Sequence, residues 1–116
     1  MIEIHCAQHK ITITGHAGYA EPGKDIVCAG VSALVQTLIQ SIETLTQDTI
    51  KCTLSPGAAE INLGDLSERA SVLVDSFFVG CTLMAGEYPD RVRVYGLPRP
   101  WDGIKSYEMT AQAWNA

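Results

Sequence analysis

Two side chains that could act together in nucleophilic catalysis lie in the stretch GHAGYAEPGKDIVCAGVSA, Gly15 to Ala33. Asp25 is a favoured helix N-cap, so a helix is predicted to begin at Ile26 with Cys28 in its first turn. The unpaired N–H groups and the positive end of the helix dipole favour a thiolate there. The Asp25 carboxylate opposes this effect, and Lys24 offsets part of it. A reactive cysteine is therefore one interpretation of this stretch.

His16 is the candidate base for that thiol. It follows a predicted strand, whereas Cys28 begins the predicted helix, so the two residues flank one loop. Gly15, Gly18 and Gly23 give this loop the freedom to bring imidazole and sulfur together. The N–H groups of the first helical turn could also form an oxyanion hole. This arrangement would suit acyl transfer.

The same residues also have a purely structural interpretation. A cysteine on a helix is often a small core residue, and a histidine after a strand is often structural. Ser32 lies one turn after Cys28 and either orients a partner or allows close packing beside Gly30 and Ala33. The remaining thiols fall on apolar stripes and are predicted to be core residues: Cys6, Cys52 and Cys81.

A metal site receives little support from the sequence. His5, Cys6 and His9 are residue types that bind zinc, but adjacent strand residues such as His5 and Cys6 point to opposite faces. No second ligand pair follows at zinc-finger spacing. We therefore expect neither a metal nor a cofactor.

The elements that must position these residues follow from hydrophobic periodicity. Ile2 to Cys6 and Ile11 to Ile13 alternate as a β-hairpin, and apolar residues then recur at helical spacing from Ile26 to Leu45. Alternation returns at Ile50 to Leu54 and Ala59 to Leu63, on either side of a Ser-Pro-Gly turn. The sequence predicts two hairpins separated by a long helix.

A second helix is predicted to begin at Asp65, which forms an Asp version of a capping box with Glu68, and to end at Gly86 in a left-handed cap. A Tyr-Pro-Asp turn then leads to a last strand at Val92 and Val94. The order ββαββαβ predicts a two-layer α+β fold with two helices on one face of a mainly antiparallel sheet. Residues 1–95 form the predicted domain, and residues 96–116 form a C-terminal tail without clear periodicity.

Composition restricts the classes of function. The chain has 116 residues, which suits one domain with its own core, and a net charge of −5. Its eight Lys and Arg residues are scattered, which argues against a nucleic-acid surface. We expect no membrane span and no secretion signal, and therefore a cytoplasmic protein with reduced thiols.

The segment GHAGYAEPGKDIVCAGVSAL resembles the signature of the ribosomal-processing cysteine protease Prp family, in which Gly-His-Ala precedes Asp-Ile-Val-Cys-Ala and a Val-Ser continuation. The resemblance extends more loosely to about residue 95. It implies that Cys28 is the nucleophile and His16 the base. Asp25 and Ser32 match supporting positions, and Gly15 allows the turn that aims the histidine.

The resemblance also implies a substrate and an assembly. Family members are expected to be homodimers that cut the N-terminal extension of a bacterial large-subunit ribosomal protein after a bulky apolar stretch. The loop after His16 is expected to be a mobile cover for the bound peptide. It comprises Ala17, Gly18, Tyr19, Ala20, Glu21, Pro22, Gly23 and Lys24.

Two alternatives remain open. One is a prophage protease that matures capsid or scaffold proteins, to which only the tail points. The other is a non-catalytic module that uses the loop as a clamp on a ribosomal or capsid protein.

Overall fold

A computed structural model describes residues 1–96, and the tail predicted at 96–116 lies outside the described residues except for Gly96. The elements follow in the order β1 (Ile2–Cys6), β2 (Lys10–Thr14), α1 (Ile26–Leu45), β3 (Lys51–Ser55), β4 (Ala58–Asn62), α2 (Glu68–Glu87) and β5 (Val92–Gly96). The predicted order ββαββαβ is confirmed.

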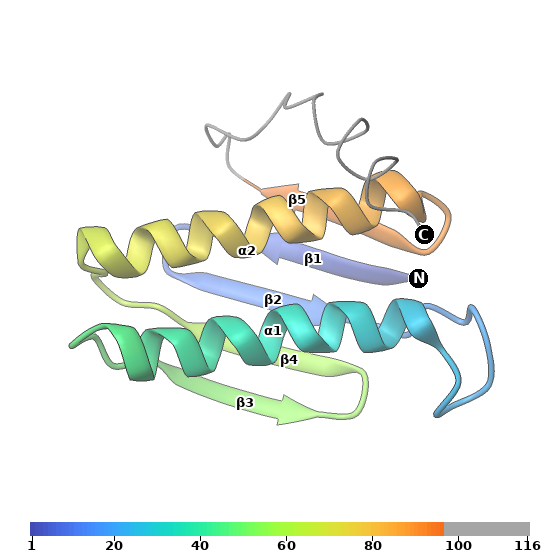
Figure 1. The fold of residues 1–116 in the computed structure, drawn as a ribbon, viewed down its shortest axis with the longest axis horizontal. Coiled ribbons are helices and arrows are strands. Elements are labelled where there is room, and N and C mark those ends of the chain that lie inside the picture. The colour runs from blue at the N-terminus through green and yellow to red at the C-terminus, as the bar shows by residue number, and fades with distance from the viewer. Residues whose placement is uncertain (97–116) are drawn as a thin grey trace.

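The strands form one sheet in the order β3-β4-β2-β1-β5. β1 pairs with β2, β2 with β4 and β3 with β4 in antiparallel register, whereas β5 pairs with β1 in parallel. Both helices lie side by side on one face of the sheet (Figure 1). The fold is therefore the predicted two-layer α+β arrangement, with a sheet that is mainly antiparallel.

The core fills the space between the helices and the sheet. Its largest fully buried side chains include Phe78 from α2, Ile42 from α1, and Ile4, Ile11 and Ile61 from three neighbouring strands. Because side chains alternate along a strand, the same strands present polar residues on their other face. Both helices have the length and hydropathy of a membrane span, but here their apolar stripes pack against the sheet, as in core helices of soluble proteins.

The start of α2 differs from the sequence prediction. The N-cap is Ser67, whose hydroxyl accepts from the N–H of Ala70 at 3.2 Å, and the predicted cap Asp65 precedes the helix. Ser67 is held from outside the segment, because its N–H and its hydroxyl donate to the Asp48 carboxylate. These hydrogen bonds, that of the Ser67 hydroxyl foremost, lower the pKa of Asp48. A contact distant in sequence therefore sets where the helix begins.

The end of α2 also differs. Gly86 lies inside the helix, and the C-cap is Tyr88, whose N–H donates to the Met84 carbonyl at 2.8 Å. The Tyr88 carbonyl accepts from the N–H groups of Arg91 and Val92. This turn leads directly into β5, so the chain reverses without a left-handed glycine.

The edge strand β3 is exposed at all five positions. The prediction that Cys52 belongs to the core is therefore wrong, whereas Cys6 and Cys81 are buried as predicted. Apolar and polar residues alternate in β3 as in the other strands, but β3 is the edge strand of the sheet and lies beyond the area that the helices cover. Leu54 also remains 55% exposed.

Candidate active site

Cys28 lies in the first turn of α1, as predicted. The Asp25 carboxylate caps the helix, because its Oδ1 accepts from the N–H groups of Val27 at 3.0 Å and Cys28 at 2.9 Å. The cysteine is half-buried and its thiol is free. The predicted N-cap thus fixes the position of the candidate nucleophile along the helix.

The second oxygen of Asp25 holds the loop before the helix. Oδ2 accepts from the N–H groups of Tyr19 at 2.9 Å and Ala20 at 3.4 Å. The backbone hydrogen bonds, that of Cys28 first, lower the pKa of Asp25 against a smaller opposing effect of desolvation. Asp25 therefore joins the loop to the start of the helix, and its expected supporting role in the site stays a prediction.

His16 follows β2 through a turn that requires glycine. Gly15 has φ +94°, and a Cβ atom at this position would overlap the carbonyl oxygen of Met1. The N–H of Gly15 donates to the carbonyl of Gly57 at 2.9 Å. The turn directs the His16 side chain toward α1, and the functional role expected for Gly15 stays a prediction.

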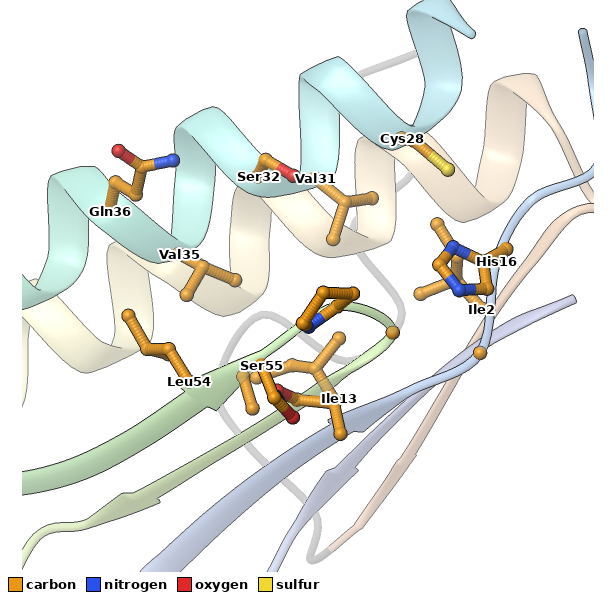
Figure 2. A pocket seen from close by; sticks show the side chains of 15 residues that line it. Ile2, Ile13, His16, Cys28, Val31, Ser32, Val35, Gln36, Leu54 and Ser55 are labelled. Carbon is orange, nitrogen blue, oxygen red and sulfur yellow. Dashed lines mark hydrogen bonds between the residues drawn. The ribbon is translucent and has the colours of Figure 1, made fainter. Parts of the chain in front are cut away.

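His16 and Cys28 line the same cavity, although they come from different elements (Figure 2). The cavity has a volume of about 370 Å³ and lies between α1 and the β3–β4 hairpin. Its other lining residues are Ile2, Ile13, Gly15, Val31, Ser32, Val35, Gln36, Leu54, Ser55, Pro56, Gly57, Ala58 and Ala59. Within residues 1–96 no hydrogen bond joins the imidazole to the sulfur, and catalytic pairs are often this loose before substrate binds.

Ser32 also lines this cavity, but within residues 1–96 it forms no hydrogen bond with His16 or Cys28. It lies one turn after Cys28 on α1, and its side chain is exposed at the cavity wall. Its expected supporting role stays a prediction. Among the described residues no side chain accepts or donates a hydrogen bond at the His16 ring, so no third residue orients the imidazole in that way.

The His16 ring is positioned by Gly57, for which the sequence predicts only a turn. Gly57 has φ +73° in the β3–β4 turn, and a Cβ atom there would lie 2.5 Å from His16 Nε2 and 3.1 Å from Cε1. The ring therefore rests against the backbone of this turn. The Ser-Pro-Gly signal predicted the turn, but its place beneath the imidazole follows only from the pairing of β2 with β4.

Replacing Gly57 by alanine is expected to lower kcat/KM for the peptide cleavage that the family resemblance implies by about 100-fold, because displacing a catalytic group by about 1 Å has effects of this size. Gly64→Ala is the matched control: Gly64 has φ +62°, so the backbone strain is similar, but nothing lies within 4 Å of its Cβ position. The comparison uses peptide kinetics and thermal unfolding of both variants. Equal losses of kcat/KM would show that the strain, and not the ring, is responsible.

The loop that was expected to cover the substrate has a fixed part and an exposed part. Ala17 is buried, and the Tyr19 ring packs edge-on against Tyr88 with centroids 5.6 Å apart. Glu21 and Lys24 are exposed and form an ion pair at 4.0 Å. Its closure over a peptide stays a prediction.

The three residues considered as zinc ligands, His5, Cys6 and His9, do not form a common site. His5 stacks on Tyr95 with centroids 4.7 Å apart, Cys6 is buried, and His9 Nδ1 lies 3.0 Å from the Gly64 carbonyl oxygen. Within residues 1–96 no group of three or more His, Cys, Asp or Glu side chains could hold a metal ion. Burial also raises the pKa of the Cys81 thiol, which disfavours its thiolate.

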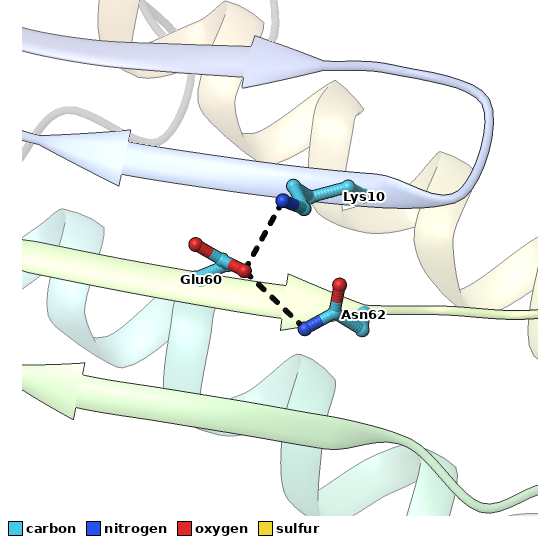
Figure 3. A network of polar contacts seen from close by, with 3 residues as sticks. All are labelled: Lys10, Glu60 and Asn62. Atoms are coloured by element: carbon cyan, nitrogen blue, oxygen red, sulfur yellow. Dashed lines mark hydrogen bonds and ion pairs between the residues drawn. The ribbon is translucent and has the colours of Figure 1, made fainter.

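The face of the sheet opposite the helices carries polar contacts away from the cavity (Figure 3). Lys10 Nζ lies 3.2 Å from Glu60 Oε1, and Asn62 Nδ2 donates to the same oxygen at 3.5 Å. The ion pair joins β2 to β4, whereas the Asn62 hydrogen bond lies within β4, and exposed ion pairs of this kind contribute little to stability. The predicted nucleophile and base, Cys28 and His16, lie apart from these contacts, at the cavity.

Comparison with known proteins gives a consistent result. The family model described as cysteine protease Prp matches residues 1–93. The ribosomal processing cysteine protease Prp of Mycoplasma genitalium is 30% identical over 92 residues, which cover 79% of this chain and 92% of that protein. The protein of the same name from Bacillus subtilis is 26% identical over 89 residues, covering 71% and 80% of the two chains.

The fold also matches solved structures. The crystal structure of an essential ribosomal processing protease Prp from S. aureus, with a covalently linked product peptide, superposes with a TM-score of 0.80. The match covers 84% of this chain and 100% of that chain at 24% sequence identity. A Streptococcus mutans structure matches with a TM-score of 0.69 at 28% identity, covering 84% and 93%.

Proposed function

The chain belongs to the cysteine protease Prp family, and from this premise we propose that it removes the N-terminal extension of a bacterial large-subunit ribosomal protein. The observation that carries the proposal is that Cys28, in the first turn of a helix, and His16, after a strand, line one cavity. Relatives over most of the chain are named ribosomal processing proteases. Together these findings favour proteolysis over a clamp without activity.

The proposed reaction is acyl transfer through the cysteine. Cys28 gives its thiol proton to His16, and the resulting thiolate attacks the scissile carbonyl carbon, so that a C–S bond forms as the carbonyl π electrons move to oxygen. When the tetrahedral intermediate collapses, the C–N bond breaks and protonated His16 gives its proton to the leaving amine. His16 then takes a proton from water, which attacks the thioester carbonyl carbon. The C–S bond breaks, which releases the new carboxyl end and regenerates the Cys28 thiolate beside protonated His16. The steps use only side chains of this chain and water.

The cavity wall suits a bulky apolar peptide beside the scissile bond. Val31 and Val35 from α1 face Ile13 from β2 and Leu54 from β3 across the opening (Figure 2). A cavity of about 370 Å³ lies within the usual size range of ligand sites. The exposed Leu54 side chain at its rim would lose contact with water when a peptide binds. This supports the expected cut after a bulky apolar stretch.

The test is cleavage of a synthetic peptide that spans the processing site of a ribosomal protein precursor. We expect a single cut after the apolar residues, read by mass spectrometry. Replacing two apolar residues before the cut by serine should lower kcat/KM by about 100-fold or more, because each buried side chain contributes about 1.5–3 kcal/mol.

The outcomes separate the alternatives. Cleavage of a phage capsid peptide but not of the ribosomal peptide would support the prophage protease. Binding of the ribosomal peptide without cleavage would support the clamp. Equal cleavage of the apolar and serine peptides would contradict the role given to the cavity wall.

We also place the protease in the cytoplasm, where ribosomal proteins are made and thiols stay reduced. The free thiols of the described residues agree with such a compartment. The homodimer implied by the family resemblance stays a prediction.

A further inference from the structure

Three N–H groups at the start of α1, where the sequence predicts an oxyanion hole, are already engaged. Asp25 Oδ1 accepts from Val27 and Cys28, and the Asp25 carbonyl accepts from Ala29 at 3.0 Å. An N–H group that already donates to a well-placed acceptor at the helix cap is not available to the reacting atoms. The hydrogen bond that meets the Cys28 sulfur comes from another segment.

That donor is the backbone N–H of Ala17. Its nitrogen lies 3.3 Å from Cys28 Sγ, and it is the N–H that meets this sulfur within residues 1–96. Ala17 is only 1% exposed, so water competes little for the contact. The donor belongs to the peptide unit between His16 and Ala17, which places the base and the sulfur's donor on adjacent residues. An N–H aimed at sulfur stabilises the thiolate over the thiol.

Arg91 holds this peptide segment from the opposite end of the chain. Its Nη1 donates to the carbonyls of Ala17 at 3.2 Å and Gly18 at 2.9 Å. The Arg91 backbone is itself anchored, because its carbonyl accepts from the N–H of Ile2 at 2.8 Å and its N–H donates to Tyr88 at 2.9 Å. In the described part of the chain the guanidinium has no carboxylate partner. Its positive charge is thus directed at the loop.

We propose that Arg91 is a positioning residue that fixes the Ala17 N–H on the sulfur of Cys28, and that this N–H is a catalytic hydrogen-bond donor. The expected effect on peptide cleavage rests on the proposed function. The expected effect on the reactivity of the Cys28 thiol can be measured without a substrate. A lysine cannot replace the arginine fully, because the planar guanidinium holds Nη1 in place for both carbonyls, whereas a lysine ammonium sits on a flexible stem. Hydrogen bonds thus connect the turn before β5 to the loop after His16, and that loop to Cys28.

The test compares Arg91→Met with Arg93→Met. Arg93 is a neighbouring exposed arginine, and within residues 1–96 no hydrogen bond or ion pair is seen for its side chain. Alkylation of Cys28 by iodoacetamide near neutral pH, followed by mass spectrometry, should be roughly tenfold slower in Arg91→Met and unchanged in Arg93→Met. If Arg91 only closed the loop, its loss would expose the sulfur and accelerate alkylation. The two roles therefore predict changes of opposite sign.

Peptide kinetics give a second measurement. Arg91→Met should lower kcat by roughly tenfold with KM within about twofold, and Arg91→Lys should fall between it and the wild type. Unchanged or faster alkylation in Arg91→Met would overturn the positioning role. If the wild type fails to cut the ribosomal peptide while Cys28 alkylation still depends on Arg91, the proposed function fails and this inference stands.

A backbone variant tests the donor without altering any side chain. Segment 1–27, made with lactic acid in place of Ala17, can be joined to segment 28–116 at the native Cys28 by chemical ligation. In this variant an ester oxygen replaces the backbone N–H of Ala17, and the side-chain methyl group stays in its buried position. The same slowing of alkylation is expected, and an unchanged rate in the folded ester protein would contradict the role of the Ala17 N–H.

Discussion

Cleavage of the ribosomal peptide is expected to fall by at least about 1000-fold when Cys28 is replaced by alanine. The reason is that the nucleophile is lost, and the remaining groups can only hold and polarise the peptide. The fold should persist, since Cys28 is half-buried and alanine suits a helix. Single-turnover cleavage at saturating enzyme measures the chemical step directly.

Cys52→Ala is the matched control for Cys28→Ala. Cys52 is an exposed free thiol on β3, so its removal should leave kcat/KM unchanged. A thioester adduct should be detected on Cys28 in the wild type and be absent from Cys28→Ala. Cleavage that survives in Cys28→Ala would contradict the mechanism.

Replacing His16 by alanine is expected to lower kcat by about 100- to 10,000-fold, the usual contribution of general acid–base catalysis. Without the imidazole, no side chain of the described cavity is in place to protonate the leaving amine. The free energy of unfolding should change little, because His16 is exposed. The measurement is peptide cleavage together with chemical unfolding.

His9→Ala is the control for His16→Ala. His9 is exposed, and its ring contact is with the Gly64 carbonyl at the other end of the sheet, outside the cavity. We expect wild-type kcat for this variant. If both variants lost the same activity, or His16→Ala lost none, the assignment of His16 as base would be wrong.

Local signals in the sequence were sufficient for much of the fold. Asp25 marked the start of α1 because a carboxylate at an N-cap satisfies N–H groups two and three residues ahead. Alternating apolar residues predicted both hairpins because the strand period is fixed by backbone geometry. Local signals failed at α2, where the contact from Asp48 to Ser67 moved the cap away from Asp65.

The sequence by itself determined the candidate nucleophile and base, because the position of Cys28 in a helix and of Gly15 before His16 depends on neighbouring residues. Only the tertiary structure decided what holds them. Gly57 lies against the His16 ring because β4 pairs with β2, and Arg91 reaches Ala17 because β5 pairs with β1. Such contacts join residues separated by dozens of positions, and no short-range pattern encodes them, since strand order is set by packing of the whole sheet.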